Sequence, residues 1–529
     1  MPRLLHEIVA DSAARDADAP AVTFKDATVG YARLWDGARR FGAGLAALGL
    51  EGGERVAIYL DKRVETVTAL IGSSVAGGVF VPINPLLKPH QVGHILGDCD
   101  VRVLVTSPER LELLRDELRD RPTVEHVIVV GERPAAAGDR PREHAWDDVA
   151  GAEPVTGRGD AGDDGDVAAI LYTSGSTGKP KGVVLSHRNL VVGATSVAGY
   201  LANDASDTIL AVLPLSFDAG LSQLTTAFAV GAHVVLVNYL LPGEVVKLCA
   251  EHRVTGLTCV PPLWLQLADR DWPVEATASM RYFANTGGRM PRATLDRLRA
   301  IFPGAAPYLM YGLTEAFRST YLDPAEVDRR PDSIGKAIPN AEILVVGEDG
   351  ARCAPGEEGE LVHRGPLVAL GYWNDPQRTA ERFRPPPAWA DGVREDELAV
   401  WSGDTVVADG DGFLAFVGRR DEMIKTSGYR VSPSEVEEVV HATGLVRDAV
   451  ALGVDDERVG QRIVLVASPP AGVELDPDEL LAELKRQLPP FMVPREVVVR
   501  SELPRSPNGK FDRNALRDEA VPVAVGAAP

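Results

Sequence analysis

A cluster of hydroxyl, glycine and lysine residues lies between two short apolar segments in the first half of the chain. From Thr173 to Lys181 it reads Thr-Ser-Gly-Ser-Thr-Gly-Lys-Pro-Lys. Glycines allow a tight turn and a close approach to a ligand, and successive backbone N–H groups in such a turn form an anion site. An ordinary hairpin loop would explain the glycines, but not two lysines beside a hydroxyl cluster. We therefore interpret the stretch as a phosphate-binding loop.

The spacing in this loop differs from that of the nucleotide P-loop, G-x-x-x-x-G-K-[ST]. Pro180 follows Lys179, and Thr173 stands where the first glycine should be. The loop instead resembles the signature loop of the adenylate-forming superfamily, which includes acyl-CoA synthetases, firefly luciferase and the adenylation domains of nonribosomal peptide synthetases. The resemblance implies that ATP phosphates bind at Thr173, Ser174, Gly175, Ser176, Thr177, Gly178, Lys179 and Lys181.

A second motif, Tyr308–Glu315, ends in Tyr-Gly-Leu-Thr-Glu and matches the family pattern Y-G-x-T-E at every fixed position. An aromatic ring at Tyr311 can stack on a base, and the Glu315 carboxylate is a hard ligand suited to Mg²⁺. Taken alone, the motif could also be a strand and turn with a surface Thr-Glu pair. The resemblance implies adenine contacts at Met310, Tyr311 and Gly312, catalytic roles for Thr314 and Glu315, and magnesium binding at Glu315.

The carboxylate of Asp218 lies in an otherwise uncharged region, where burial without a partner is costly. One interpretation is that Ser216 or Asp218 caps a helix that starts at Leu221. The other is a carboxylate that waits for a cation. In amino-acid-activating members of the superfamily, an aspartate beside an aromatic residue binds the substrate α-amino group. Phe217-Asp218 resembles that pair and implies an amino-acid pocket.

Two further turns are predicted to bind ligand only on the basis of the resemblance. The Gly-Gly turn in Asn285–Met290 would line the substrate, with Thr286 and Gly287 at the acyl pocket and Gly288 and Arg289 at the adenine and ribose. Asp404 would bind both ribose hydroxyls, although aspartate after glycine is most often an ordinary turn residue. Arg419, in a Gly-Arg-x-Asp pattern, would contact ribose or phosphate.

Three C-terminal residues also match positions with a role in the superfamily. The resemblance implies that Asp421 is the hinge between two domains and that Gly428 lines a channel for a thiol. It also makes Lys510 the catalytic lysine, which bridges the substrate carboxylate and the α-phosphate. Gly428 and Lys510 could otherwise belong to plain turns.

The elements that position these residues alternate between helical and strand patterns, which predicts an α/β layer architecture. Gly131–Asp166 is polar and rich in Gly, Pro, Ala and Asp, and we interpret it as a surface connection. After Arg420 the pattern changes to a compact segment with helices predicted at Pro433–Thr443 and Pro477–Leu488. The resemblance implies a large multi-layer α/β N-terminal domain, residues 1–420, and a small mobile α+β C-terminal domain, residues 421–529.

Composition narrows the class of protein further. The 529 residues carry a formal net charge of −21, which argues against general binding of nucleic acid or of an anionic membrane. The four cysteines are widely spaced and form no C-x-x-C pair, so we predict free thiols rather than a zinc site. We find neither a signal peptide nor a membrane span in the pattern, and we expect a cytoplasmic protein.

Together the motifs predict ATP- and Mg²⁺-dependent activation of a carboxylic acid to its acyl-adenylate, with release of pyrophosphate. Asp218 favours a small amino acid as substrate, with transfer to the phosphopantetheine thiol of a separate carrier protein in natural product biosynthesis. The alternative is an AMP-forming acyl-CoA ligase for a fatty or other organic acid, in which Asp218 only caps a helix. A module that binds ATP without chemistry is disfavoured by Glu315 and Lys510.

Overall fold

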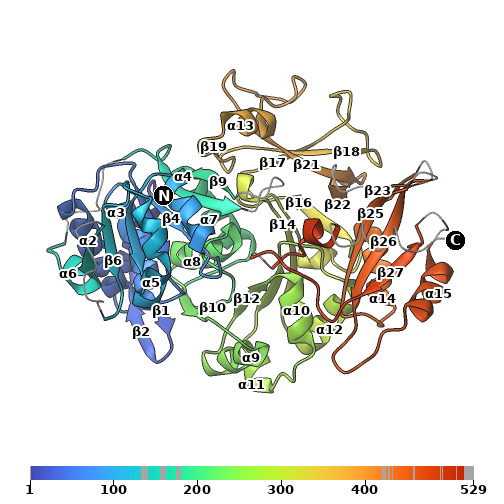
Figure 1. The fold of residues 1–529 in the computed structure, drawn as a ribbon, viewed down its shortest axis with the longest axis horizontal. Coiled ribbons are helices and arrows are strands. Elements are labelled where there is room, and N and C mark those ends of the chain that lie inside the picture. Colours follow the sequence, from blue (N-terminus) through green and yellow to red (C-terminus); the bar gives the residue numbers. More distant parts are fainter. Residues whose placement is uncertain are drawn as a thin grey trace.

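The computed structural model describes residues 2–87, 89–132, 141–154, 162–173, 180–419, 424–426, 429–431, 433–456, 459–488, 490, 492–507 and 509–517. Within them, two extended sheets and their helices form a large body, and a third sheet with two helices forms a smaller C-terminal part (Figure 1). This arrangement confirms the predicted fold class. Among the described helices, none is long and apolar enough to cross a membrane.

The largest sheet has 14 strands. They are β1 Pro20–Phe24, β2 Ala27–Gly30, β10 Thr208–Ala211, β11 His233–Leu236, β12 Gly256–Cys259, β13 Tyr282–Asn285, β14 Ala306–Tyr311, β15 Thr320–Leu322, β16 Ser333–Ala337, β17 Glu342–Val346, β18 Glu358–Arg364, β20 Phe383–Arg384, β21 Ala399–Ala408 and β22 Leu414–Arg419. Their order is β17-β18-β21-β22-β16-β15-β14-β13-β12-β10-β11-β1-β2, with β20 beside β21. The strands from β10 to β14 pair in parallel, whereas β15 to β22 pair with antiparallel neighbours.

The second sheet has eight strands in the order β19-β9-β8-β4-β3-β5-β6-β7. They are β3 Arg55–Tyr59, β4 Val79–Pro82, β5 Val101–Thr106, β6 His126–Val129, β7 Arg142–Ala145, β8 Val167–Thr173, β9 Lys181–Ser186 and β19 Gly371–Tyr372. Strands β8 and β9 pair antiparallel as a hairpin, and the predicted phosphate loop connects them. The polar stretch predicted as a surface connection contains β7 and the helix α6, Trp146–Ala150, so that interpretation is wrong in part. Both elements are short, and their polar residues hide the pattern.

Helices fill the space between the two sheets and cover their outer faces. The central layer comprises α1 Leu5–Arg15, α2 Tyr31–Ala47, α3 Val64–Val75, α7 His187–Tyr200 and α8 Asp218–Val230, whose apolar faces share one core with both sheets. The outer face of the larger sheet carries α9 Pro242–Glu251, α10 Pro261–Ala268, α11 Val274–Thr277 and α12 Arg292–Ile301. The outer face of the second sheet carries α4 Pro89–Asp98 and α5 Pro108–Arg119. Parallel strands covered on both faces are mostly apolar, as observed in β4 and in β3 after Arg55.

The C-terminal part contains a five-stranded sheet with the order β24-β23-β26-β25, in which β27 pairs with β26. Its strands are β23 Ile424–Thr426, β24 Tyr429–Val431, β25 Asp448–Asp456, β26 Gly460–Ser468 and β27 Glu496–Val499. Helices α14 Pro433–Ala442 and α15 Pro477–Gln487 pack on it around a separate core. In Figure 1 this part, drawn in red, lies at one end of the molecule, and α14 contacts α12 of the large body. A further helix, α13 Pro376–Arg382, follows β19.

Candidate active site

Four neighbouring parallel strands of the larger sheet, β10, β12, β13 and β14, end along the same edge. In open α/β sheets, ligands bind outside the carboxyl ends of such strands. The segment after β10 leads to Asp218, the segment after β13 is the Gly-Gly turn, and β14 ends at Tyr311. The fold therefore brings together three motifs that are far apart in the sequence.

Glu315 lies in a hydrogen-bonded polar cluster at this edge. It lies in a short 3₁₀ turn, Thr314–Ala316, and its Oε1 accepts from Lys181 Nζ at 3.0 Å and from the Tyr372 hydroxyl at 2.6 Å. Lys181 Nζ also donates to Tyr372 at 2.8 Å. Burial raises the pKa of Glu315, but the Lys181 charge and the Tyr372 hydroxyl outweigh it and lower that pKa to about 2. Burial and the nearby carboxylate raise the pKa of Tyr372.

This cluster joins two predicted motifs, because Lys181 ends the phosphate loop and Glu315 ends the Y-G-x-T-E motif. No group of three or more His, Cys, Asp or Glu side chains that could hold a metal ion occurs among the described residues. Magnesium that serves a nucleotide takes one or two carboxylates and otherwise phosphate and water oxygens. Glu315 is such a single carboxylate. It fits an ion of this kind because Lys181 and Tyr372 both donate to the same one of its two oxygens.

Asp218 lies at the first position of α8, directly after the N-cap residue Phe217. Within the described part of the chain, the N-cap residue makes no side-chain capping bond, and the buried Oγ of Ser216 has no hydrogen-bond partner. The predicted alternative, in which Ser216 or Asp218 caps a helix from Leu221, is therefore wrong. The turn of Pro214 to Phe217 starts the helix three residues earlier than the apolar pattern suggests. Asp218 Oδ1 instead accepts from Thr314 Oγ1 at 3.1 Å.

Lys62 holds the backbone that leads into α8. Its ammonium donates to the carbonyl oxygens of Ala211, Val212 and Leu213 at 2.9, 2.8 and 3.2 Å. Burial lowers the pKa of Lys62 to about 7. The segment between β10 and Asp218 is thus fixed by a buried cation that the sequence analysis did not select.

The Gly-Gly turn is closed by its own asparagine, since Asn285 Nδ2 donates to the Gly288 carbonyl at 2.7 Å. Gly287 has a φ of +75°, and a Cβ atom there would meet Val260 Cγ1 at 3.1 Å. Glycine therefore suits the turn both in conformation and in space. Thr286, in the same turn, accepts a hydrogen bond from the buried Arg318 guanidinium.

The loop of Lys510 lies against the same edge of the large body. Asn84 Nδ2 donates to the Pro507 carbonyl at 3.0 Å, and a Cβ on Gly509 would lie 3.9 Å from Val260. The loop keeps its shape through the Lys510 carbonyl, which accepts from the Ser506 N–H at 2.8 Å. Val260 is therefore a neighbour of both the Lys510 loop and the Gly-Gly turn.

The predicted nucleotide residues form a second contact group. The Tyr311 hydroxyl donates to Asp404 Oδ2, and Asp404 is 3% exposed. Arg419 pairs with Asp404 in the register of β21 and β22, and its side chain lies outside the described part of the chain. Arg289, by contrast, donates to Asp332 at 2.7 Å and lies 3.6 Å from Glu438 of α14. Its predicted contact with the nucleotide stays a prediction.

Several predicted residues lie outside the described residues, namely Ser174, Gly175, Ser176, Thr177, Gly178, Lys179, Asp421 and Gly428. At the start of that loop, the buried Thr173 Oγ1 has no hydrogen-bond partner among the described residues. The same holds for Ser216 Oγ, Asn285 Oδ1 and Arg318 Nε. Buried polar groups normally have partners, and these four atoms lie in or directly beside the predicted motifs, as expected for a ligand site.

Residues 9–373 match the AMP-binding enzyme family, and residues 435–510 match the C-terminal domain of AMP-binding enzymes. The chain belongs to the AMP-binding enzyme family. It is 30% identical to a long-chain-fatty-acid–CoA ligase of Salmonella typhimurium over 98% of this chain and 94% of that protein. It is 29% identical to one of the linear gramicidin synthase polypeptides of Brevibacillus parabrevis over 97% of this chain, but it spans only 10% of that protein.

The solved structure of ATP-bound MatB from Rhodopseudomonas palustris has a TM-score of 0.85 and 26% identity, and the alignment covers 99% of this chain and 100% of MatB. These likenesses support an AMP-forming acid–thiol ligase, as the sequence analysis predicts. In this AMP-binding enzyme, the residues that sequence reasoning missed are Tyr372, Asn84, Lys62 and Arg318. None lies in a local motif that points to its contact, except Arg318, which follows the Y-G-x-T-E motif closely.

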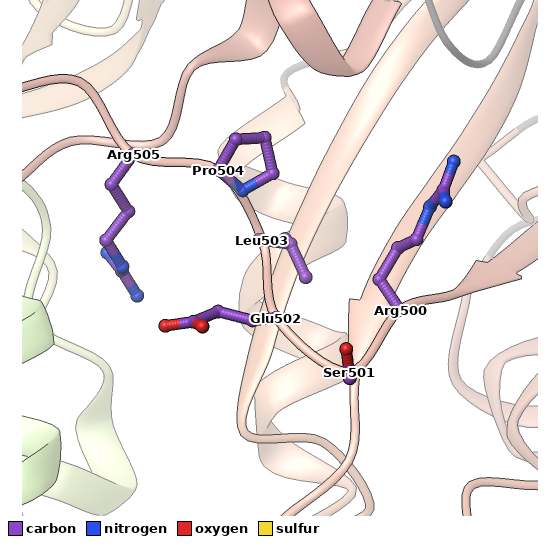
Figure 2. Close-up of a pocket in the computed structure, with 6 residues that line it drawn as sticks. All are labelled: Arg500, Ser501, Glu502, Leu503, Pro504 and Arg505. Carbon is purple, nitrogen blue, oxygen red and sulfur yellow. The ribbon is translucent and has the colours of Figure 1, made fainter.

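One surface hollow, of about 490 Å³, lies apart from these contacts. It is lined by Arg500, Ser501, Glu502, Leu503, Pro504 and Arg505, on the segment that precedes the Lys510 loop. Figure 2 shows the Glu502 and Arg505 side chains on the same side of this segment, whereas Arg500 points elsewhere. Arg505 donates to Asp448 at 2.7 Å, which anchors the segment to β25. We assign the hollow no role in the chemistry of this AMP-binding enzyme.

Proposed function

We propose that this AMP-binding enzyme activates a small amino acid with Mg·ATP. The products of the first step are the aminoacyl-adenylate and pyrophosphate. In the second step, the thiol of a phosphopantetheine group on a separate carrier protein takes the aminoacyl group and releases AMP. The carboxylate of Asp218 carries the choice of an amino acid over other acids.

Asp218 supports this choice because it is half-buried and has no cationic partner among the described residues. It accepts a hydrogen bond from Thr314, directly before Glu315. A half-buried carboxylate gains most from a partner that bears a positive charge. The α-ammonium of an amino acid would supply that charge and would orient the reacting carboxylate toward the phosphate end of the site.

The activation step needs donors around the α-phosphate, where negative charge gathers as the substrate carboxylate attacks. Lys510 would donate to the substrate carboxylate and the α-phosphate, and Thr314 and the loop N–H groups would add donors. Lys181 would serve the phosphates as well. Magnesium, when bound beside Glu315, would neutralise phosphate charge. The Tyr311 ring would stack on adenine, and Asp404 would accept hydrogen bonds from the ribose.

The transfer step needs room for a thiol where Lys510 lies during activation. A rotation about Asp421 would withdraw the Lys510 loop and bring Gly428 to the site. A hinge of this kind absorbs the change in φ and ψ at a few residues. The contacts of Asn84 and Val260 with the Lys510 loop are consistent with the conformation that activates the acid.

The second candidate is an AMP-forming acyl-CoA ligase for a fatty or other organic acid. One relative that matches this chain over nearly the whole length of both proteins is a long-chain-fatty-acid–CoA ligase, which favours this candidate. It predicts that Asp218 makes no contact with the substrate and that coenzyme A is the acceptor.

The deciding experiment is pyrophosphate exchange into ATP with a panel of amino acids, fatty acids and aryl acids. For the preferred amino acid, Asp218→Asn should lower the exchange rate by roughly two to four orders of magnitude, since loss of one partner of a buried ion pair costs about 3–5 kcal/mol. The KM for ATP should stay nearly unchanged.

Asp478→Asn is a matched control, because Asp478 is an exposed aspartate in the first turn of α15. It should leave exchange intact, which separates the role of a substrate contact from that of any helix-terminal carboxylate. An Asp218→Asn enzyme that activates its best acid at the full rate would favour the acyl-CoA ligase. Separate assays with coenzyme A and with a loaded carrier protein then identify the acceptor.

A further inference from the structure

Arg318 is a buried cation without a buried anion beside it. Among the described residues, three cationic side chains are buried: Lys62, Arg318 and Arg364, with exposed fractions of 8%, 2% and 7%. Lys62 has three carbonyl partners, and Arg364 Nε donates to Glu397 Oε1 at 2.8 Å. In the same described part of the chain, no carboxylate forms an ion pair with Arg318. Its hydrogen bond goes to the Thr286 hydroxyl, and its Nε is enclosed without a partner.

The backbone before Arg318 adopts a conformation that is rare for a side chain of this size. Phe317 has φ +57° and ψ −61°, and the Arg318 N–H donates to the Ala316 carbonyl at 2.6 Å. These values describe a γ-turn of the positive-φ type, which is strained. Such strain is retained where the surrounding structure requires it, often at ligand sites. Here the turn brings Arg318 back against Gly312, where an added Cβ would meet Arg318 Cα at 3.0 Å.

The segment from Gly312 to Arg318 therefore connects two charged groups at the substrate end of the site. Thr314 touches the Asp218 carboxylate, and Arg318 touches Thr286 of the Gly-Gly turn. A guanidinium matches a carboxylate in a bidentate geometry. An unpaired buried charge is costly, and a substrate that supplies the missing charge offsets that cost on binding.

We infer that Arg318 is a specificity-determining residue that binds an anionic group on the substrate side chain. The substrate class is then an amino acid with an acidic side chain, whose ammonium pairs with Asp218 and whose second carboxylate pairs with Arg318. The first carboxylate reacts with ATP. This inference rests on the proposed activation of an amino acid, and the test below separates the two.

Four related acids form the test: aspartate, alanine, succinate and propionate. Alanine lacks the second carboxylate of aspartate, succinate lacks its ammonium, and propionate lacks both. Glutamate, 2-aminobutyrate, glutarate and butyrate repeat the set with one more methylene. Pyrophosphate exchange is measured for each acid with the wild-type enzyme, Asp218→Asn and Arg318→Met.

We expect an acidic amino acid to give the fastest exchange in one of the two sets. Arg318→Met should lower kcat/KM for that acid by roughly 10²- to 10⁴-fold, the range for loss of one partner of a buried ion pair. It should change kcat/KM for the neutral amino acid by no more than about threefold. Thr286→Val removes the hydroxyl next to the guanidinium but keeps the charge, so its effect on the acidic amino acid should be smaller.

Two results would overturn the inference. One is a wild-type enzyme that prefers neutral amino acids. The other is an Arg318→Met enzyme that loses exchange equally with all acids while its KM for ATP and its melting temperature stay normal. If Arg318→Met does not fold, Arg318→Lys and the wild-type preferences decide the question. Exchange with succinate or glutarate, but not with amino acids, would refute the role of Asp218 and retain that of Arg318.

Discussion

Replacement of Glu315 by Gln tests whether the Lys181–Glu315–Tyr372 cluster stabilises the fold as well as the site. Glutamine has the shape of a protonated glutamate, so it removes the charge that Lys181 faces at 3.0 Å. The pKa of Glu315 falls from 4.5 to about 2 in the folded protein. At 1.36 kcal/mol for each pKa unit, the folded state stabilises the ionised form by about 3 kcal/mol. We expect Glu315→Gln to lose about that much stability at pH 7.

The pH dependence provides the sharper test of the same variant. A carboxyl whose pKa is lower in the folded state contributes stability above its unfolded pKa and loses it as pH falls toward its folded pKa. The difference in the free energy of unfolding between wild type and Glu315→Gln should therefore be largest above pH 4.5 and should decrease as pH falls toward 2. Free energies of unfolding from urea titrations at several pH values measure it. Glu275→Gln, at an exposed glutamate of α11, is the control and should show no gap.

Two results would refute this reasoning about Glu315. One is a gap that does not depend on pH, which would point to packing rather than charge. The other is a gap below about 1 kcal/mol at pH 7, the range of an exposed ion pair. A double-mutant cycle with Lys181→Met isolates the pair itself, because the coupling disappears once either partner is gone.

Three further predictions concern catalysis, domain movement and the backbone before α8. Lys510→Ala should abolish pyrophosphate exchange but leave thioester formation from a supplied adenylate largely intact; equal loss of both steps would contradict separate conformations. Asp421→Pro fixes φ and removes a donor, so exchange should continue while thiol transfer stops; wild-type rates of both would exclude Asp421 as the hinge. Lys62→Met should lose at least about 2 kcal/mol of stability, because buried carbonyls lose their donor. Burial lowers the Lys62 pKa from 10.5 to about 7, so folding favours the neutral amine. In urea titrations, the stability of the wild type relative to Lys62→Met should therefore rise between pH 7 and pH 10.5. A difference that stays constant over this range would contradict the prediction.

The sequence predicted the local features of the fold well. The two short apolar segments on either side of the phosphate loop are the strands β8 and β9, and the helices predicted at Pro433–Thr443 and Pro477–Leu488 differ from α14 and α15 by one residue at their ends. Such features depend on periodicity and on turn residues that are close in the sequence. The prediction of a surface connection at Gly131–Asp166 was wrong in part because β7 and α6 are only four and five residues long.

The contacts of the site could not be predicted from local pattern. Tyr372 lies 57 residues from Glu315 and 191 from Lys181, and only the pairing of β19 with β9 brings it close. Asn84 reaches Pro507 across 423 residues. At the helix that begins at Asp218 a local signal was present but misleading, since Ser216 is a good capping residue by type. The turn of Pro214 to Phe217 determines the start of the helix instead.

The charged groups of the site fall into two kinds, and under the proposed function this difference determines which acids the enzyme selects. Lys181 pairs with Glu315, and Tyr311 donates to Asp404, so these groups are oriented before any substrate binds. Preorganised groups lower the barrier of a reaction common to all acids, because they need no rearrangement during it. Asp218 and Arg318 have no oppositely charged partner among the described residues, so the cost of their burial depends on the substrate. Under the proposed function, a hydrocarbon acid would leave the half-buried Asp218 and the buried Arg318 without a charged partner, and discrimination against it would arise from that cost rather than from a poor fit of shape.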